Sequence, residues 1–229
     1  MELKNKTVIV TGGADGLGLS VVKCLLEKGA IVHVVSRNVE RHKQIMQEIQ
    51  NTNLFTHQAD VSKYSNVEKA VREIGNVDIL INNAGVWLEG DLIKNSLENI
   101  SRTIDINTKG VIYTTKAVLP AMLSKNKGIV LNISSTSGLE GRKKSSVYCA
   151  SKWAVTGFTQ SLKEDLKGTN VRVLGFYPGG MNTTLFSNAG NDKDTSKFMD
   201  PMEIAEIIIF ILQRPEGINM DNVVVNRNK

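Results

Sequence analysis

Short runs rich in β-branched residues alternate with amphipathic stretches along the whole 229-residue chain. Successive β-α-β units produce this alternation, and such units place parallel strands in one sheet with helices packed against it. We therefore predict an α/β fold built on a parallel sheet. The strands are expected at Thr7–Thr11, Ile31–Ser36, Leu54–Asp60, Val77–Asn82, Ile129–Ile133, Val171–Tyr177 and Val223–Val225.

The chain shows no internal linker and no break in composition, which predicts one domain over residues 1–229. Its apolar fraction of 41% and charged fraction of 22% are those of an ordinary globular protein. No apolar leader is seen at residues 1–6, and the apolar run Ile204–Leu212 is too short to span a bilayer. Cys24 and Cys149 have neither metal-ligand spacing nor the number of a disulfide framework. We expect a cytoplasmic protein with no membrane partner and no metal.

The net charge of +5 raises the question of a nucleic-acid partner. The basic residues are scattered among 23 acidic ones without interleaved aromatic residues, so we expect no nucleic-acid binding. An anionic cofactor or substrate accounts for the excess charge equally well.

A glycine-rich turn follows the first predicted strand directly and opens a helix. Glycines at such a turn let the backbone approach a pyrophosphate, whose charge is met by free N–H groups and the helix dipole. A purely structural turn is the alternative, but the place between strand and helix favours dinucleotide binding. The candidate contacts in this turn are Gly12, Asp15, Gly16, Leu17 and Gly18.

The ends of the next strands supply further cofactor candidates. Ser36 and Arg37 offer a hydroxyl and a guanidinium where a carboxylate would select NAD, so NADP(H) is predicted and NAD remains possible. Asp60 and Val61 are expected to meet the adenine, with Asp60 as a plain helix N-cap as the alternative. A cofactor lying across the sheet edge would also meet Asn83, Ala84 and Gly85.

Tyr148 and Lys152 are four residues apart, so on a helix they share one face and form a candidate acid/base pair. The Lys152 ammonium and an oxidised nicotinamide are both expected to favour the phenolate. Ser135 is expected to donate to the substrate oxygen. Asn107, in a predicted helix from Leu97 to Met122, is expected to hold a water near Lys152. For each of these residues taken alone, an ordinary structural role is the alternative: Ser135 as a turn residue, Asn107 as a surface or helix-kink residue, and Tyr148 with Lys152 as a chance pairing.

These motifs together resemble the short-chain dehydrogenase/reductase family in its shorter, one-domain form. The resemblance covers nearly the whole chain and implies a Rossmann-type, doubly wound sheet of about seven strands in three αβα layers. It also implies a catalytic tetrad of Asn107, Ser135, Tyr148 and Lys152, and a homodimer or homotetramer. The nicotinamide would be held by Pro178, Gly179, Met181 and Thr183. NADP-preferring relatives often carry a basic residue where this chain has Asp15.

The resemblance implies an oxidoreductase that transfers a hydride between NADP(H) and a carbonyl or secondary alcohol. A 3-oxoacyl thioester, a hydroxy acid or another ketone are the candidate substrates, and the basic loop at residues 140–144 favours an anion. The polar segment Thr184–Asp200 is expected to act as a substrate lid. Alternatives are an epimerase or dehydratase with tightly held NAD, and a catalytically silent NADP(H)-sensing regulatory protein.

Overall fold

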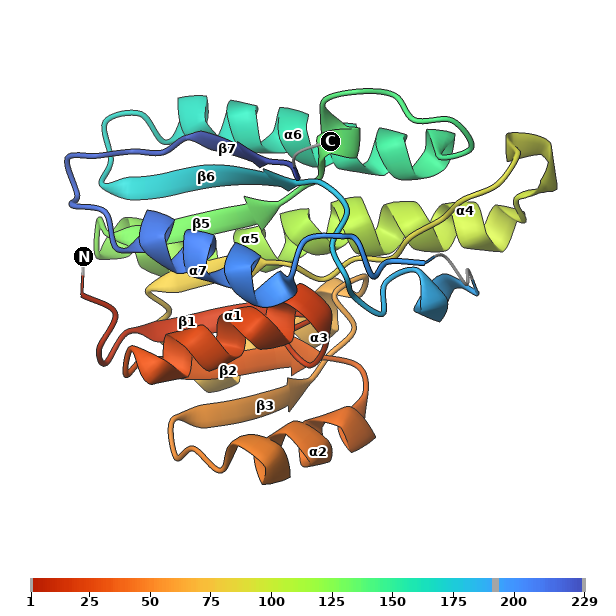
Figure 1. The fold of residues 1–229 in the computed structure, drawn as a ribbon. Helices are drawn as coiled ribbons and strands as arrows, with labels where there is room; N and C mark the ends of the chain where they lie inside the picture. Colours follow the sequence, from red (N-terminus) through yellow and green to blue (C-terminus); the bar gives the residue numbers. More distant parts are fainter. Residues whose placement is uncertain (1, 191–193, 228–229) are drawn as a thin grey trace.

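The computed structural model describes residues 2–190 and 194–227, and its centre is a seven-stranded parallel sheet in the order β3-β2-β1-β4-β5-β6-β7 (Figure 1). The strands are β1 (Thr7–Thr11), β2 (Ile31–Ser36), β3 (Leu54–Gln58), β4 (Ile79–Asn82), β5 (Gly128–Ile133), β6 (Val171–Pro178) and β7 (Asn222–Val225). This order confirms the predicted doubly wound α/β fold. β3 stops two residues earlier than predicted, because the Asp60 carboxylate accepts from the backbone N–H of Ser62 and turns the chain.

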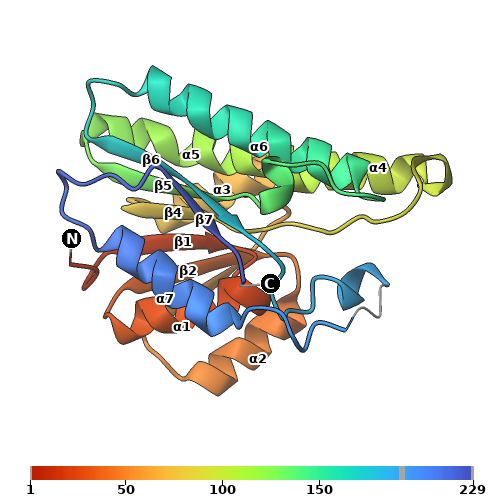
Figure 2. The ribbon, with the colours of Figure 1, turned by 45° about the horizontal axis from the view of Figure 1, so that its top comes forward.

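Helices cover both faces of the sheet and complete three layers (Figure 2). One face carries α1 (Gly16–Glu27), α2 (Val39–Ile49) and α7 (Pro201–Leu212), and the other carries α3 (Tyr64–Ile74), α5 (Gly110–Ser124) and α6 (Ser146–Asp165). Strand side chains alternate between the two cores: Val8 and Val10 pack on the first face, and Ile9 packs on the second. Burial on both faces accounts for the nearly continuous apolar character of these strands.

The predicted helix from Leu97 to Met122 is not one regular helix. It consists of α4 (Leu97–Ile104), a π-helical turn at Asp105–Lys109 and α5. π-turns widen a helix locally and often occur at functional sites. Here the turn contains Asn107, whose side chain is fully buried.

β1 and β4 are neighbours in the sheet, and the chain leaves them in opposite directions. Ligands of doubly wound folds bind at this switch point, outside the carboxyl ends of the strands. Thr11 holds the two strand ends together, because its hydroxyl accepts from the backbone N–H groups of Asn83 and Ala84, each at 3.0 Å. Within the described residues, no helix combines the length and apolar character needed to cross a bilayer.

Candidate active site

A cavity of about 1320 Å³ opens at the carboxyl ends of the strands. It brings together nearly all of the residues predicted from the sequence, and their roles there remain predictions. The predicted residues that line it are Gly12, Asp15, Gly16, Leu17, Ser36, Arg37, Asp60, Val61, Asn83, Ala84, Gly85, Ser135, Tyr148, Lys152, Pro178, Gly179, Met181 and Thr183. Gly18 and Asn107 lie just behind this lining rather than in it.

The glycine-rich turn requires glycine for two separate reasons. Gly12 has a φ of +64°, and a Cβ there would lie 2.9 Å from the Cα of Ala84. Gly18 packs so closely beneath the turn that a Cβ would lie 2.3 Å from the Gly12 carbonyl oxygen. The Asn83 amide donates to the carbonyls of Thr11 and Gly12, which fixes the turn from the β4 side. The result is a rigid backbone cradle at the N-terminus of α1.

The end of β2 differs in detail from the prediction. Arg37 is exposed on the cavity wall, near Asp60. Burial acts to raise the pKa of Asp60, but the hydrogen bonds from Ser62 and, to a smaller extent, the Arg37 charge outweigh it and lower that pKa. The Ser36 hydroxyl, however, pairs with the buried imidazole of His42 at 2.6 Å. Asp60 is not the N-cap of α3, because that position belongs to Lys63. Its carboxylate instead accepts from the backbone N–H and the hydroxyl of Ser62.

A second guanidinium lies at the cofactor end and was missed by the sequence analysis. Arg41, in the first turn of α2, donates through Nε to the Ala14 carbonyl and to the Asp15 carboxylate, both at 3.1 Å. A basic group therefore stands beside Asp15 although the glycine-rich turn itself contains none. The signal in the sequence was the spacing of Arg37 and Arg41 across the start of a helix.

Tyr148 and Lys152 lie on one face of α6, as their spacing predicted, and both side chains are buried. The Lys152 ammonium lies 5.9 Å from the centroid of the Tyr148 ring and donates to the Ile133 carbonyl at 3.0 Å. The Ser135 hydroxyl is close enough to hydrogen-bond with Tyr148. It also accepts from the backbone N–H of Ser137, so its orientation is fixed.

The pKa of Tyr148 is raised above its ordinary value in this structure. Burial raises it to about 12, and this outweighs the opposing effects of the Ser135 hydrogen bond and the Arg142 charge. Burial also lowers the pKa of Lys152 to about 8, since the ammonium is taken out of water. Desolvation dominates both groups in this arrangement. The expectation that the Lys152 ammonium and an oxidised nicotinamide together favour the phenolate stays a prediction.

The Asn107 side chain is fully used by protein partners. Its Oδ1 accepts from the Val86 backbone N–H at 2.8 Å, and its Nδ2 donates to the Val86 carbonyl and the Ser151 hydroxyl. The expectation that Asn107 holds a water near Lys152 stays a prediction. The side chain of Asn107 fixes the segment that follows Gly85 against α6.

An aromatic row forms one wall of the cavity, and the sequence analysis did not find it. Trp87 packs on Tyr148 with ring centroids 4.3 Å apart, Phe186 packs on Trp87 at 5.1 Å, and Phe198 packs on Phe186 at 5.9 Å. The nearness of Trp87 to the Asn83-Ala84-Gly85 motif was the available signal. Of these rings, that of Trp87 packs directly on the Tyr148 ring.

Part of the segment Thr184–Asp200 lines the cavity, through Thr184, Leu185, Phe186 and Phe198, while residues 191–193 lie outside the described residues. Its far end pairs with the segment after β6, where Asn182 donates to the Met199 carbonyl and Met199 donates to the Gly180 carbonyl. Thr183 approaches the glycine-rich turn, within 3.3 Å of where a Cβ on Gly16 would be. The predicted nicotinamide-holding residues therefore border both the turn and the catalytic pair.

The fold and cavity define a dinucleotide-binding α/β protein with a buried Tyr–Lys pair at the far end of its cofactor cradle. A family model for the short chain dehydrogenases matches residues 6–194. The chain belongs to the short-chain dehydrogenase/reductase family, a family of oxidoreductases, which confirms the resemblance.

Relatives cover nearly the whole chain. An uncharacterized oxidoreductase of Staphylococcus saprophyticus is 37% identical over 234 residues, with 98% of each chain covered. A solved structure of serine dehydrogenase in a closed form with NADP+ is 33% identical, has a TM-score of 0.90 and covers 96% of this chain and 94% of its own. Serine dehydrogenase from Escherichia coli is 31% identical, with a TM-score of 0.86 and 96% of each chain covered.

Proposed function

We propose that this protein is an NADP(H)-dependent oxidoreductase that interconverts a carbonyl and a secondary alcohol, with Tyr148 as the acid/base. The observation that carries the proposal is the convergence of Tyr148, Lys152 and Ser135 in one cavity with the glycine-rich turn. The phenol of Tyr148, the ammonium of Lys152 and the hydroxyl of Ser135 then lie at one end of a cradle that is suited to a dinucleotide.

The residues at the cofactor end fit a phosphorylated dinucleotide. The turn around Gly16 presents backbone N–H groups at the start of α1, and a Cβ at Gly12 or Gly18 would collide with the backbone that shapes the cradle. Arg37 and Arg41 supply two guanidinium groups near the place where a 2′-phosphate would lie. The similar serine dehydrogenase holds NADP+, which supports NADP(H) over NAD.

When bound, the nicotinamide accepts or supplies the hydride. In the oxidation direction Ser135 donates a hydrogen bond to the substrate oxygen, and Tyr148 takes the hydroxyl proton as the carbon loses its hydride. In reduction Tyr148 returns that proton. Lys152 supplies positive charge beneath the phenol and can donate to the ribose hydroxyls, while Asn107 holds the adjoining backbone through Val86.

Among the candidate substrates, a hydroxy acid has the most support. Both similar serine dehydrogenases are named for a substrate with a hydroxyl and a carboxylate. A 3-oxoacyl thioester and other ketones remain in the test panel. The proposal also includes a homodimer or homotetramer in the cytoplasm, as the family resemblance implies. The silent regulatory alternative has no support from the site, since all four tetrad residues are present.

The test is cofactor absorbance with the purified protein, in both directions, on hydroxy acids, neutral alcohols, oxoacyl thioesters and ketones. We expect turnover with NADP(H) on at least one class. Tight NADPH binding with no turnover on any class would contradict an enzyme and favour a sensing protein. Turnover with NAD alone would overturn the cofactor assignment.

A further inference from the structure

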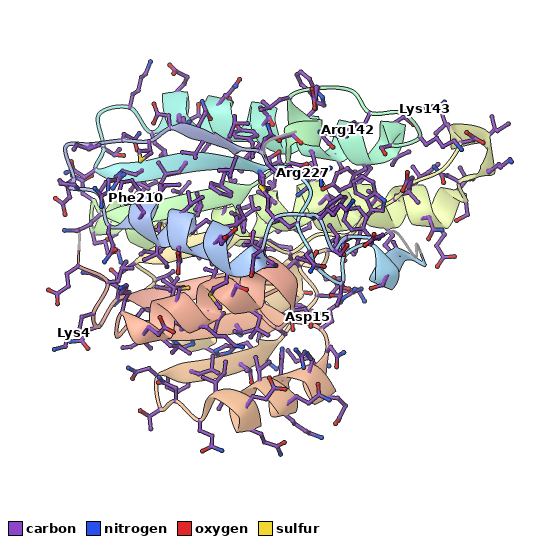
Figure 3. All side chains as sticks on the ribbon, viewed as in Figure 1. Lys4, Asp15, Arg142, Lys143, Phe210 and Arg227 are labelled. Atoms are coloured by element: carbon purple, nitrogen blue, oxygen red, sulfur yellow. The ribbon has the colours of Figure 1, made fainter. Side chains whose placement is uncertain are left out.

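Charged residues gather at the substrate end of the cavity. Arg142, Lys143 and Arg227 line it, together with Glu89 and Glu140. Figure 3 shows Arg142 well separated from Asp15 of the glycine-rich turn, so it does not belong to the cofactor cradle. A cation at this end can therefore act on the substrate.

Arg142 is held beside Ser135 by two hydrogen bonds of its guanidinium. Its Nη2 donates to the hydroxyl of Thr136 at 2.9 Å and to the Glu140 carboxylate at 2.8 Å. Thr136 is buried and directly follows Ser135, which is the proposed donor to the substrate oxygen. Among the described residues these two are the hydrogen-bond partners of the guanidinium, both on Nη2, which leaves Nε and Nη1 as donors.

The charge of Arg142 reaches the acid/base itself. It lowers the pKa of Tyr148, against the larger effect of burial. Arg227 has a different attachment, since it donates to the Lys197 carbonyl at 2.7 Å and lies over the Phe198 ring. Lys144 is exposed, lies two residues after Arg142 and is not among the residues that line the cavity, which makes it a matched control for charge.

The ion pair with Glu140 does not prevent Arg142 from binding a substrate. Both side chains are largely exposed, at 44% for Arg142 and 64% for Glu140, and such pairs contribute little to stability. A planar guanidinium matches a carboxylate through two parallel hydrogen bonds. Trp87 and Phe186 line the same cavity and pack on each other, so they add apolar surface beside the guanidinium.

We propose that Arg142 binds a carboxylate of the substrate and so selects short hydroxy acids and the corresponding oxo acids. The proposal rests on the function proposed above and names the substrate class of that site. The substrate hydroxyl lies at Tyr148 and Ser135, and its carboxylate pairs with Nε and Nη1 of Arg142. Neutral alcohols and esters lack this contact.

The experiment compares 2- and 3-hydroxy acids, including 3-hydroxybutyrate, with their amides, which have the same shape and no charge. With NADP+ as acceptor, wild type is expected to show a kcat/KM about 10- to 100-fold higher for a preferred acid than for its amide. Arg142→Met should remove that preference, chiefly by raising KM for the acid far more than for the amide. Arg142→Lys should restore part of the preference. Lys144→Met should behave as wild type.

Propionate adds a binding readout without turnover. It should inhibit wild type competitively against the hydroxy acid and inhibit Arg142→Met much more weakly, while propionamide should inhibit neither. Equal turnover of acids and amides by wild type would overturn the role of Arg142 and leave the oxidoreductase intact. An equal loss for acids and amides in Arg142→Met would show a structural role instead. No turnover of any acid, alcohol or ketone would overturn the proposed function itself.

Discussion

The indole of Trp87 packs against the ring of Tyr148, with centroids 4.3 Å apart and planes tilted by 54°. The two residues are 61 positions apart in the sequence, so only the fold brings them together. The contact helps to keep the phenol out of water, and that burial raises the pKa of Tyr148 to about 12. A phenol held neutral in this way is ready to donate a proton in reduction.

Tyr148→Phe should abolish most turnover without unfolding the chain. The substitution removes the hydroxyl and keeps the ring that packs on Trp87, so the melting temperature and NADPH affinity should change little. We expect kcat to fall by about 10²-fold or more, which is the usual contribution of a positioned acid/base. Tyr177→Phe is the control, because Tyr177 is also buried but bonds Asn222 away from the cavity. Near-normal turnover in Tyr148→Phe would rule out the mechanism.

The two directions of the reaction should depend on pH with opposite sign. Oxidation requires deprotonated Tyr148, and since its pKa is held near 12, log kcat/KM should rise with a slope near one from pH 7 to pH 10. Reduction requires the protonated phenol, which stays protonated from pH 7 to pH 10, so ionisation of Tyr148 should not lower the rate of reduction over this range. If the charge of the bound oxidised nicotinamide lowers the pKa of Tyr148, log kcat/KM for oxidation should reach a plateau above that pKa. A falling oxidation rate over the same range would contradict the assignment.

Lys152→Met should lower both turnover and NADPH affinity, because the ammonium serves the phenol and the ribose together. The same variant should make the apoprotein more stable at pH 7 by about 1–2 kcal/mol. Lowering the lysine pKa from 10.5 to about 8 destabilises the folded chain by about 3 kcal/mol, which the variant would recover. The variant also loses the hydrogen bond from Lys152 to the Ile133 carbonyl, and this loss reduces the gain. Lys163→Met, on the same helix, is the control for turnover and affinity.

The pH dependence fixes the sign of this stability effect. Below about pH 8 Lys152 is protonated in both folded and unfolded chains, and its burial cost is fully present. From pH 8 to 10.5 the unfolded chain binds more protons, so wild-type stability from this group rises with pH. The advantage of Lys152→Met in denaturant unfolding should therefore shrink between pH 7 and pH 10. A constant difference would show that Lys152 is not buried as a charge.

The double variant Ser36→Asp with Arg37→Gln should invert the cofactor preference. Wild type is expected to prefer NADP(H) by about 10- to 100-fold, since charge-assisted hydrogen bonds to the 2′-phosphate have no counterpart in NAD. A carboxylate at position 36 would accept from the NAD ribose and repel the phosphate. Because Ser36 bonds His42, the single variant Arg37→Gln separates the charge effect from the loss of that bond.

Arg41→Gln extends this measurement of kcat/KM for both cofactors. Arg41 stands beside Asp15, so its loss should reduce the NADP(H) preference less than loss of Arg37 does. If wild type prefers NAD, or if the double variant leaves the ratio unchanged, Arg37 is only a surface residue.

Amide exchange should slow in the segment Thr184–Asp200 when NADPH and a substrate analogue bind. The segment is polar except for a few anchors such as the buried Phe186, and its bonds to Gly180 and Asn182 lie near its Asp200 end. Closure over the cofactor would protect residues 184–190 and 194–198, whereas peptides from β5 should exchange equally in both states. Equal exchange of the segment with and without ligands would argue against a lid.

Local patterns in the sequence were sufficient for the fold and for part of the site. The period of two in β1, with Val8 and Val10 on one face and Ile9 on the other, and the glycine turn after it predict strand, turn and helix from neighbouring residues alone. The spacing of Tyr148 and Lys152 likewise specifies one helix face. The single-domain prediction for residues 1–229 stays a prediction.

Tertiary structure decided what depends on distant contacts and on solvent. The pairing of Ser36 with His42, the approach of Arg41 to Asp15 and the packing of Trp87 on Tyr148 all join segments from different elements. Burial raises the pKa of Tyr148 and lowers that of Lys152, which the spacing of the two residues could not predict, because the free energy of an ionised group depends on how completely it leaves water. Periodicity is encoded locally along the chain, whereas desolvation is a property of the packed whole.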